Sequence, residues 1–289
     1  MEVDGARAAD VTILRHRTAA DFLSATHALR SADPLLTNIM GSVATGVVDG
    51  RTYDSEMWLT VHDGGHLVGM AMRTAPWNLA LSAMPALAAE ELGRYVATAD
   101  PDLPGVIGPG KTVDAVVTGI APAAGRRPRT RMVDVLRVLT SLRPPRGVPG
   151  VVRGARAEDT ALLVQWHHGF ADDAGLPAHD LEESVLRQVS DGALWIWEVD
   201  AVPVAMAGHA PIVATPVGAV ARIGPVFTPA ESRGRGYGSA VTAAVAQELL
   251  PHCGTVMLFA DAAKPEVNRL YERLGFVEAA RIVEVALDG

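Results

Sequence analysis

The sequence contains one cysteine, few aromatic residues and no apolar run that is long enough to cross a bilayer. Because Cys253 is alone, it can form neither an intramolecular disulfide nor a zinc cluster built from several cysteines. Residues 1–10 are acidic and polar rather than basic and then apolar, so they do not have the pattern of a secretory signal. We therefore expect a cytoplasmic protein that has no membrane partner.

Lysine is also scarce, since Lys111 and Lys264 are the only lysines among the 25 basic residues, a bias that we attribute to genome composition. The net charge of −8 lies entirely in residues 151–289, because acidic and basic side chains balance in residues 1–150. An acidic half repels nucleic acid, so we expect no nucleic-acid partner. The length of 289 residues is enough for two domains of ordinary size.

A basic, glycine-rich segment lies in the second half, at residues 233–239 (Arg-Gly-Arg-Gly-Tyr-Gly-Ser). It follows an apolar run at 223–227 and precedes a helical pattern rich in alanine and valine. Glycines allow successive backbone N–H groups to turn toward an anion, and a helix N-terminus adds positive charge. The segment therefore predicts a phosphate-binding loop, although its alternating glycines do not fit the Gly-x-Gly-x-x-Gly fingerprint of dinucleotide-binding proteins.

Two motifs resemble those of one family. The pattern R-x-x-G-x-G from Arg233 to Gly238 resembles the pyrophosphate loop of the GNAT superfamily of acyl-coenzyme A-dependent acetyltransferases. Residues 268–276 resemble that family's N-x-x-Y motif followed by Gly-Phe, and a predicted strand at 255–260 lies between the two motifs. The resemblance implies an α/β fold of the mixed (α+β) type, a twisted mixed sheet flanked by helices, and acetyl-coenzyme A (acetyl-CoA) as cofactor.

The resemblance also implies roles for individual residues. The backbone of residues 226–228 would pair with the pantetheine arm, and the Val226 N–H would polarise the thioester carbonyl. Asn268 would position the arm, and Tyr271 would protonate the departing sulfur. The cofactor-binding residues implied in this way are Val226, Phe227, Thr228, Arg233, Gly234, Arg235, Gly236, Tyr237, Gly238, Ser239 and Asn268, and the catalytic residue is Tyr271.

The two halves of the chain repeat one pattern. Residues 204–207 (Val-Ala-Met-Ala) match residues 68–71 (Val-Gly-Met-Ala), and Lys111 and Lys264 each open a predicted helix that leads to a strand. The first half has no counterpart of the glycine loop: residues 77–103 offer Glu90 and Glu91, which would repel pyrophosphate in its place. We therefore predict a degenerate, structural GNAT-like domain at 1–143, a linker at 144–150 and a catalytic GNAT domain at 151–289.

The acceptor and the base are less defined. The predicted strand at 219–226 lacks the carboxylate that is often found there in this family, so Glu198, His209 and Glu231 are substitutes, and water or an already neutral amine stays open. We expect a small-molecule or peptide amine as acceptor. A cationic amine would suit an acidic group that could equally be a solvated helix face, formed by Asp172, Asp173, Asp180, Glu182 and Glu183.

Two other functions fit parts of the sequence. A non-catalytic acyl-CoA sensor or scaffold would have the same loop and no turnover, and it stays open. An ATPase phosphate loop fits residues 105–112 letter by letter, but Pro101 and Pro104 precede it and the predicted helix after it is short, so we disfavour it. No metal site is expected, because His167 and His168 are adjacent on a predicted helix and point in different directions.

Overall fold

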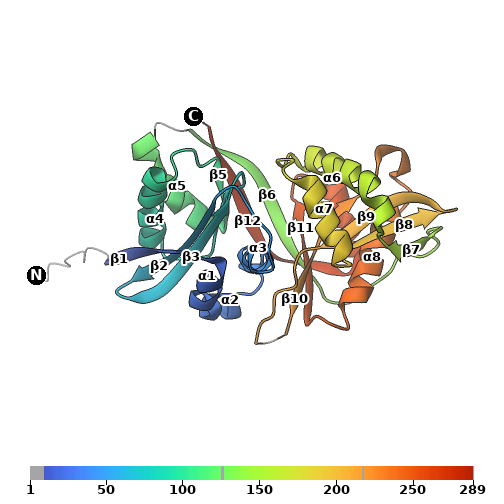
Figure 1. Cartoon of the computed structure of the whole chain (residues 1–289), viewed down its shortest axis with the longest axis horizontal. Helices are drawn as coiled ribbons and strands as arrows, with labels where there is room; N and C mark the ends of the chain where they lie inside the picture. The colour runs from blue at the N-terminus through green and yellow to red at the C-terminus, as the bar shows by residue number, and fades with distance from the viewer. Residues whose placement is uncertain (1–9, 125–126, 217, 289) are drawn as a thin grey trace, which may run out of the picture. The chain divides into compact units, whose positions relative to one another are not determined.

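The structure is a computed structural model that describes residues 10–124, 127–216 and 218–288. Contacts between residues divide the chain into two compact units (Figure 1). Unit 1 consists of Met1–Val133 and Arg281–Gly289, and unit 2 is Asp134–Ala280. Within the described ranges, no helix combines the length and the apolar character that a bilayer span requires.

Unit 1 contains a mixed sheet in the order β1-β2-β3-β4-β5-β12. Neighbouring strands are antiparallel except β4 and β5, which are parallel. Its strands are β1 (Val11–His16), β2 (Glu56–Asp63), β3 (His66–Thr74), β4 (Leu79–Leu81), β5 (Gly105–Gly108) and the C-terminal part of β12 (Phe276–Asp288). Its helices are α1 (Ala19–Ala25), α2 (His27–Ala32), α3 (Asn38–Val48), α4 (Ala86–Ala99) and α5 (Gly110–Ala124).

Unit 2 repeats this arrangement in the order β7-β8-β9-β10-β11-β6, with β10 and β11 as its parallel pair. Its strands are β7 (Val151–Gly154), β8 (Leu194–Val199), β9 (Val202–His209), β10 (Val220–Phe227), β11 (Thr255–Asp261) and the C-terminal part of β6 (Arg127–Leu139). Its helices are η1 (Ala157–Asp159), α6 (Thr160–Ala174), α7 (Leu181–Ser190), η2 (Ala230–Ser232), α8 (Tyr237–Leu249) and α9 (Pro265–Leu274). The predicted fold, a mixed sheet flanked by helices and present twice, is confirmed.

The sixth strand of each sheet comes from the other half of the sequence. In unit 2, residues 134–138 of β6 pair with residues 257–261 of β11. In unit 1, residues 283–286 of β12 pair with β5. The two units therefore do not coincide with the ranges 1–143 and 151–289 that the sequence pattern indicates, because the strand that follows α5 joins β11 instead of β5.

The sheet of unit 2 is covered on both faces. Since side chains alternate along a strand, Ala205 and Ala207 of β9 face α8 and α9, whereas Met206 faces α6. The first core also contains Tyr237 of α8 and Tyr271 of α9. Both helices that carry the predicted cofactor motifs thus pack against the same face of the sheet.

The residues before β7 pack onto unit 2. Residues 144–150 form neither helix nor strand, as their prolines and glycines predict. Val148 nevertheless packs against the core beneath α8, and the indole Nε1–H of Trp197 donates to the Pro149 carbonyl at 2.9 Å. This segment is therefore fixed to the body that carries the glycine loop.

Several local predictions were wrong. The apolar pattern of residues 19–29 predicts one helix, whereas the structure has α1 and α2 with an interruption at Thr26, and the sequence pattern did not indicate α3. The clustered arginines at 126–131 predict a loop, but the segment lies in β6 from Arg127 onward, where the arginines at 127, 129 and 131 alternate with other residues. Arg126 lies outside the described residues.

We predict that a fragment of residues 134–280 folds more stably than a fragment of residues 151–289. The second fragment lacks β6, so the edge of β11 would be open, and Asn268 and Glu272 would lose the guanidinium of Arg137 that binds both. Thermal unfolding followed by circular dichroism should give it a midpoint lower by at least roughly 10 °C. Equal midpoints would contradict the importance of β6 for unit 2.

Candidate active site

The strands β10 and β11 separate before either one ends. Their paired residues run from Val220 and Thr255 to Ile223 and Leu258, whereas β10 continues to Phe227 and β11 to Asp261. The pairing of β10 with β9 also shifts between Ile223 and Val226, where Pro225 contributes no N–H. Beyond Ile223, the edge of β10 that faces β11 is therefore unpaired with that strand, and its backbone groups are available to a ligand.

The loop after β10 turns its backbone toward the start of α8. Gly234 and Gly236 adopt left-handed backbone angles, with φ of 77° and 85°, and Gly236 is the residue that precedes the helix. The Ala240 N–H makes a helical hydrogen bond to the Gly236 carbonyl at 3.0 Å. The N–H groups of residues 237–239 lie before it, in the first turn, where a helix supplies no acceptor. This helix start suits an anion.

Close packing explains two of the loop glycines. A Cβ atom on Gly236 would lie 3.0 Å from Val148 Cγ2, and one on Gly238 would lie 3.2 Å from Thr228 Oγ1. A side chain at Gly236 would also be strained by the positive φ. The glycines thus keep the loop backbone close to the residues beneath it and free of side chains above.

The residues of the loop differ in the groups with which they could bind an anion. The ring of Tyr237 is buried in the core, so the group that Tyr237 presents at the loop is its backbone N–H. Arg235 is exposed, and within the described ranges it forms no hydrogen bond or ion pair. Arg233 is engaged: its Nη2 lies 2.5 Å from Asp173 Oδ2, and its Nε–H donates to the Thr228 carbonyl at 2.9 Å.

Asn268 is held by three hydrogen bonds within unit 2. Its side-chain Nδ2 donates to the carbonyls of Asp261 at 2.7 Å and Lys264 at 3.0 Å, and its Oδ1 accepts from Arg137 Nε at 3.1 Å. Both amide protons are therefore used to fix the turn between β11 and α9. Asn268 is placed to position α9, and it has no amide proton left for a direct contact with the cofactor arm.

Arg137 was missed by the sequence analysis. It is a buried guanidinium on β6 that binds Asn268 and also Glu272 at 2.9 Å. A single arginine within the apolar strand pattern at 132–138 was the available signal, but its partners lie more than 130 positions away in the sequence. It anchors α9 from the first half of the chain.

Tyr271 lies three residues after Asn268 and so on the same side of α9. Its ring packs edge-on against Phe276, with ring centroids 6.0 Å apart. Burial raises the pKa of Tyr271 to about 12, because the phenolate is poorly solvated there. Tyr271 therefore carries its proton at neutral pH, so its hydroxyl has a proton to donate.

The three substitutes for the missing base lie in different places. Glu198 on β8 accepts from Arg153 Nε at 2.7 Å and is separated from β10 by β9. Glu231 is exposed in η2. His209 is on β9 opposite Ile223, where its Nδ1–H donates to the Ala210 carbonyl at 2.7 Å. His209 thus adjoins the point where β10 and β11 separate, with Nε2 as the ring atom that can accept a proton.

The predicted acidic group is partly neutralised by neighbouring side chains. Asp173 binds Arg233, Glu183 lies 2.7 Å from Arg187, and Asp180 lies 2.9 Å from His179. Asp172 and Glu182 are exposed. Three of the five residues therefore already have a partner, which is the behaviour expected of a solvated helix face.

Unit 1 has a short apolar connection where unit 2 has the glycine loop. Residues 82–85 alone join β4 to α4, and Met84 packs so closely that a Cβ on Gly69 would lie 2.8 Å from it. Glu90 and Glu91 lie within α4, where both form ion pairs with Arg94, so they do not take the loop's place.

The ATPase pattern has no phosphate loop in the structure. Gly105–Gly108 form β5, and a Cβ on Gly108 would lie 2.7 Å from the Leu81 carbonyl, so these glycines serve strand packing. The helix α5 that follows is longer than predicted, and this reason for disfavouring the pattern was wrong. The backbone groups of residues 105–108 are used in the sheet and cannot turn toward a phosphate. This alone excludes the ATPase interpretation.

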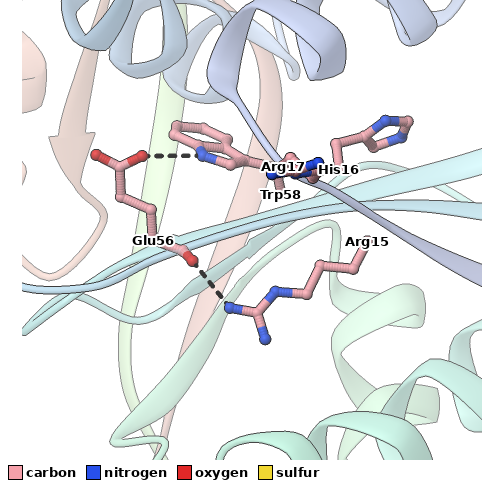
Figure 2. A pocket seen from close by; sticks show the side chains of 5 residues that line it. All are labelled: Arg15, His16, Arg17, Glu56 and Trp58. Atoms are coloured by element: carbon pink, nitrogen blue, oxygen red, sulfur yellow. Dashed lines mark hydrogen bonds between the residues drawn. The ribbon is translucent and has the colours of Figure 1, made fainter.

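A cavity of about 330 Å³ lies in unit 1, between the end of β1 and the start of β2 (Figure 2). Two hydrogen bonds join its lining residues: the Trp58 indole donates to the Glu56 carboxylate at 3.0 Å, and Arg15 donates to the Glu56 carbonyl at 3.2 Å. Because all the lining residues are in unit 1, the cavity lies in a different unit from the glycine loop. In the part of the chain that the structure describes, no group of His, Cys, Asp and Glu side chains is arranged to hold a metal.

Comparison with known proteins agrees with the site. Residues 162–276 match the model of the acetyltransferase (GNAT) family, a range that begins within α6 and includes the glycine loop, Asn268 and Tyr271. The match thus covers a GNAT domain that lies within unit 2. The family and the fold indicate an acyl-CoA-dependent acetyltransferase in general, and acetyl-CoA is the co-substrate that GNAT proteins generally use.

Two solved structures resemble the chain over nearly its whole length. An acetyltransferase of the GNAT family from Colwellia psychrerythraea is 13% identical, with a TM-score of 0.64, over 96% of this chain and 100% of that one. A tandem GNAT protein from the clavulanic acid biosynthesis pathway is 14% identical, with a TM-score of 0.58, over 97% and 99% of the two chains. These likenesses show the tandem fold. No curated protein sequence matches.

We predict that Tyr271 lowers the alkaline stability of the protein. Its pKa is about 12 when folded, against about 10 for an exposed tyrosine, so above pH 10 the unfolded state has lost a proton that the folded state keeps. The free energy of unfolding should therefore fall as pH rises from 10 to 12. It should fall by about 2 kcal/mol more over this pH range in the wild type than in Tyr271→Phe. Urea unfolding at several pH values measures this, and parallel pH profiles would refute it.

Proposed function

We propose that the chain transfers an acetyl group from acetyl-CoA directly to the amine of a small molecule or peptide. The observation that carries this proposal is the meeting of three features in unit 2. These are the open edge of β10 at 224–227, the glycine loop at the start of α8, and a protonated Tyr271 on α9. Together they supply an edge for an amide-containing arm, a site for pyrophosphate and a proton donor.

The chain's own groups fit the cofactor in two places. The N–H groups of residues 237–239 and the side chain of Arg235 would hold the pyrophosphate, with Arg233 as a second cation of the same loop. The N–H groups lie in the first turn of α8, and Arg235 is exposed and forms no ion pair among the described residues. The backbone of Val226, Phe227 and Thr228 would pair with the two amides of the pantetheine arm. The Val226 N–H would then be the donor for the thioester oxygen.

Tyr271 would supply the proton for the sulfur. When the amine nitrogen forms its bond to the acetyl carbon, the bond from that carbon to sulfur breaks and the sulfur becomes a thiolate. The hydroxyl of Tyr271, protonated over the whole physiological range, gives up its proton at that moment. Asn268 and Arg137 contribute indirectly, because they fix the start of α9 on which Tyr271 is carried.

The amine must lose a proton during the reaction. His209 Nε2 is the acceptor that we favour among the three substitutes, because Glu198 is bound by Arg153 and Glu231 lies in the exposed η2 turn. Water could accept this proton instead of His209, and an amine that arrives neutral would need no base to become nucleophilic. Unit 1 lacks a counterpart of the loop, so we propose that it is structural and that each chain binds one coenzyme A.

We predict that Gly236→Asp abolishes most coenzyme A binding. The new side chain would be strained at a φ of 85° and would press on Val148, which would displace the loop backbone, and its carboxylate would add a negative charge beside the anion site. Calorimetry should show one site per wild-type chain and an affinity at least about 100-fold lower in the variant.

Gly50→Asp is the matched control for this experiment. Gly50 also has a positive φ, 95°, with open space around it, but it lies in unit 1. It should bind coenzyme A as the wild type does. Unchanged affinity in Gly236→Asp, or two sites per wild-type chain, would contradict the proposal.

We predict that Tyr271→Phe lowers turnover by about 100-fold while the affinity for coenzyme A changes little. The substitution keeps the ring that packs on Phe276 and removes only the hydroxyl. Tyr95→Phe, on α4 of unit 1, is the control and should keep full activity. Thiol release from acetyl-CoA with a panel of amines measures turnover. Coenzyme A binding without thiol release from any amine would indicate an acyl-CoA sensor instead.

A further inference from the structure

One face of α6 packs against the end of β10. The ring of Trp166 lies 6.4 Å from that of Phe227, and Gly169 makes room for Phe227, because a Cβ there would lie 2.6 Å from Phe227 Cζ. Asp173 follows one turn later on the same face, since residues spaced by three and four align on a helix. The packing of α6 therefore delivers a carboxylate to the loop that follows Phe227.

That carboxylate binds the first arginine of the glycine loop. Asp173 Oδ2 lies 2.5 Å from Arg233 Nη2, and the Arg233 guanidinium also stacks over the Phe227 ring, 5.8 Å from its centroid. The backbone carbonyl of Asp173 accepts from Lys264 Nζ at 2.7 Å. Asp173 is thus fixed from two sides, by the loop and by the residue that precedes α9.

In this pair, the Asp173 carboxylate occupies the Arg233 guanidinium, a cation that pyrophosphate would otherwise bind. Both side chains are about half exposed, at 50% and 48%, and exposed ion pairs contribute little net stability, so an incoming anion can displace the carboxylate. After displacement, Asp173 would stay near the phosphates and repel them. Arg235 has no such partner among the described residues, so the two arginines of the loop are not equivalent.

We propose that Asp173 is a built-in competitor of coenzyme A for Arg233. It lowers the affinity of the loop for the cofactor and thereby favours release of the coenzyme A product. The inference rests on the proposed function, because it requires coenzyme A to bind at residues 233–239. It assigns Asp173 a role inside the cofactor site, in place of the acceptor rim that its charge alone indicates.

The experiment is calorimetric titration of coenzyme A into Asp173→Asn, with Asp172→Asn as the matched control. Asp172 is the adjacent exposed carboxylate, so its loss changes the net charge equally without releasing Arg233. Asp173→Asn should bind about threefold to tenfold more tightly than the wild type at low salt, and this gain should shrink as salt is added. Asp172→Asn should change the affinity by less than about twofold.

A double-mutant cycle isolates the pair. In an Arg233→Met background, Asp173→Asn should no longer tighten binding, because there is no arginine left to release. The same gain in both backgrounds, or unchanged or weaker binding in Asp173→Asn, would overturn the role of Asp173 and leave the proposed function intact. Failure of wild type and Asp173→Asn alike to bind coenzyme A would overturn both, and thermal unfolding of each variant verifies that it is folded.

Discussion

The antiparallel pairing of β6 with β11 is the constraint on which the candidate site depends. It closes the edge of β11 and brings the buried Arg137 to Asn268 and Glu272. Without it, the start of α9 would lose the guanidinium that joins Asn268 and Glu272 to the sheet. Burial of a guanidinium costs free energy unless its N–H groups are hydrogen-bonded. The two partners of Arg137 therefore also fix the position of β6 against α9. The orientation of Tyr271 therefore depends on a strand that ends 94 positions before the first family motif begins at Arg233.

The two copies differ where an anion would bind. Each contains a parallel strand pair with a helix between the strands, so the sheet alone does not decide which copy can hold coenzyme A. In unit 2 a glycine-rich connection leaves the first turn of α8 accessible, whereas in unit 1 a short connection places Met84 against β3. The apolar contact stabilises unit 1, and it fills the space that a phosphate loop needs.

The sequence predicts the fold and the glycine loop well, because both depend on local patterns. A nearly continuous apolar run defines β9, and the glycines at 234 and 236 have the backbone angles that only glycine adopts easily. The repeat of the two halves also followed from spacing. Contacts between distant residues could not be predicted: Arg137 with Asn268 and Asp173 with Arg233 each join segments whose separation is set by the tertiary fold. The exchange of β6 and β12 is of this kind too.

That exchange makes unit 1 discontinuous in sequence, because Asp134–Ala280 lies between its first part and Arg281–Gly289. During synthesis from the N-terminus, the edge of β5 that pairs with residues 283–286 must therefore wait until those residues emerge from the ribosome. Unit 2, by contrast, has all its strands once residue 280 has been made. Unit 1, although its first part is translated before unit 2, thus completes its sheet after unit 2, and its exposed edge is the segment that a chaperone would need to shield.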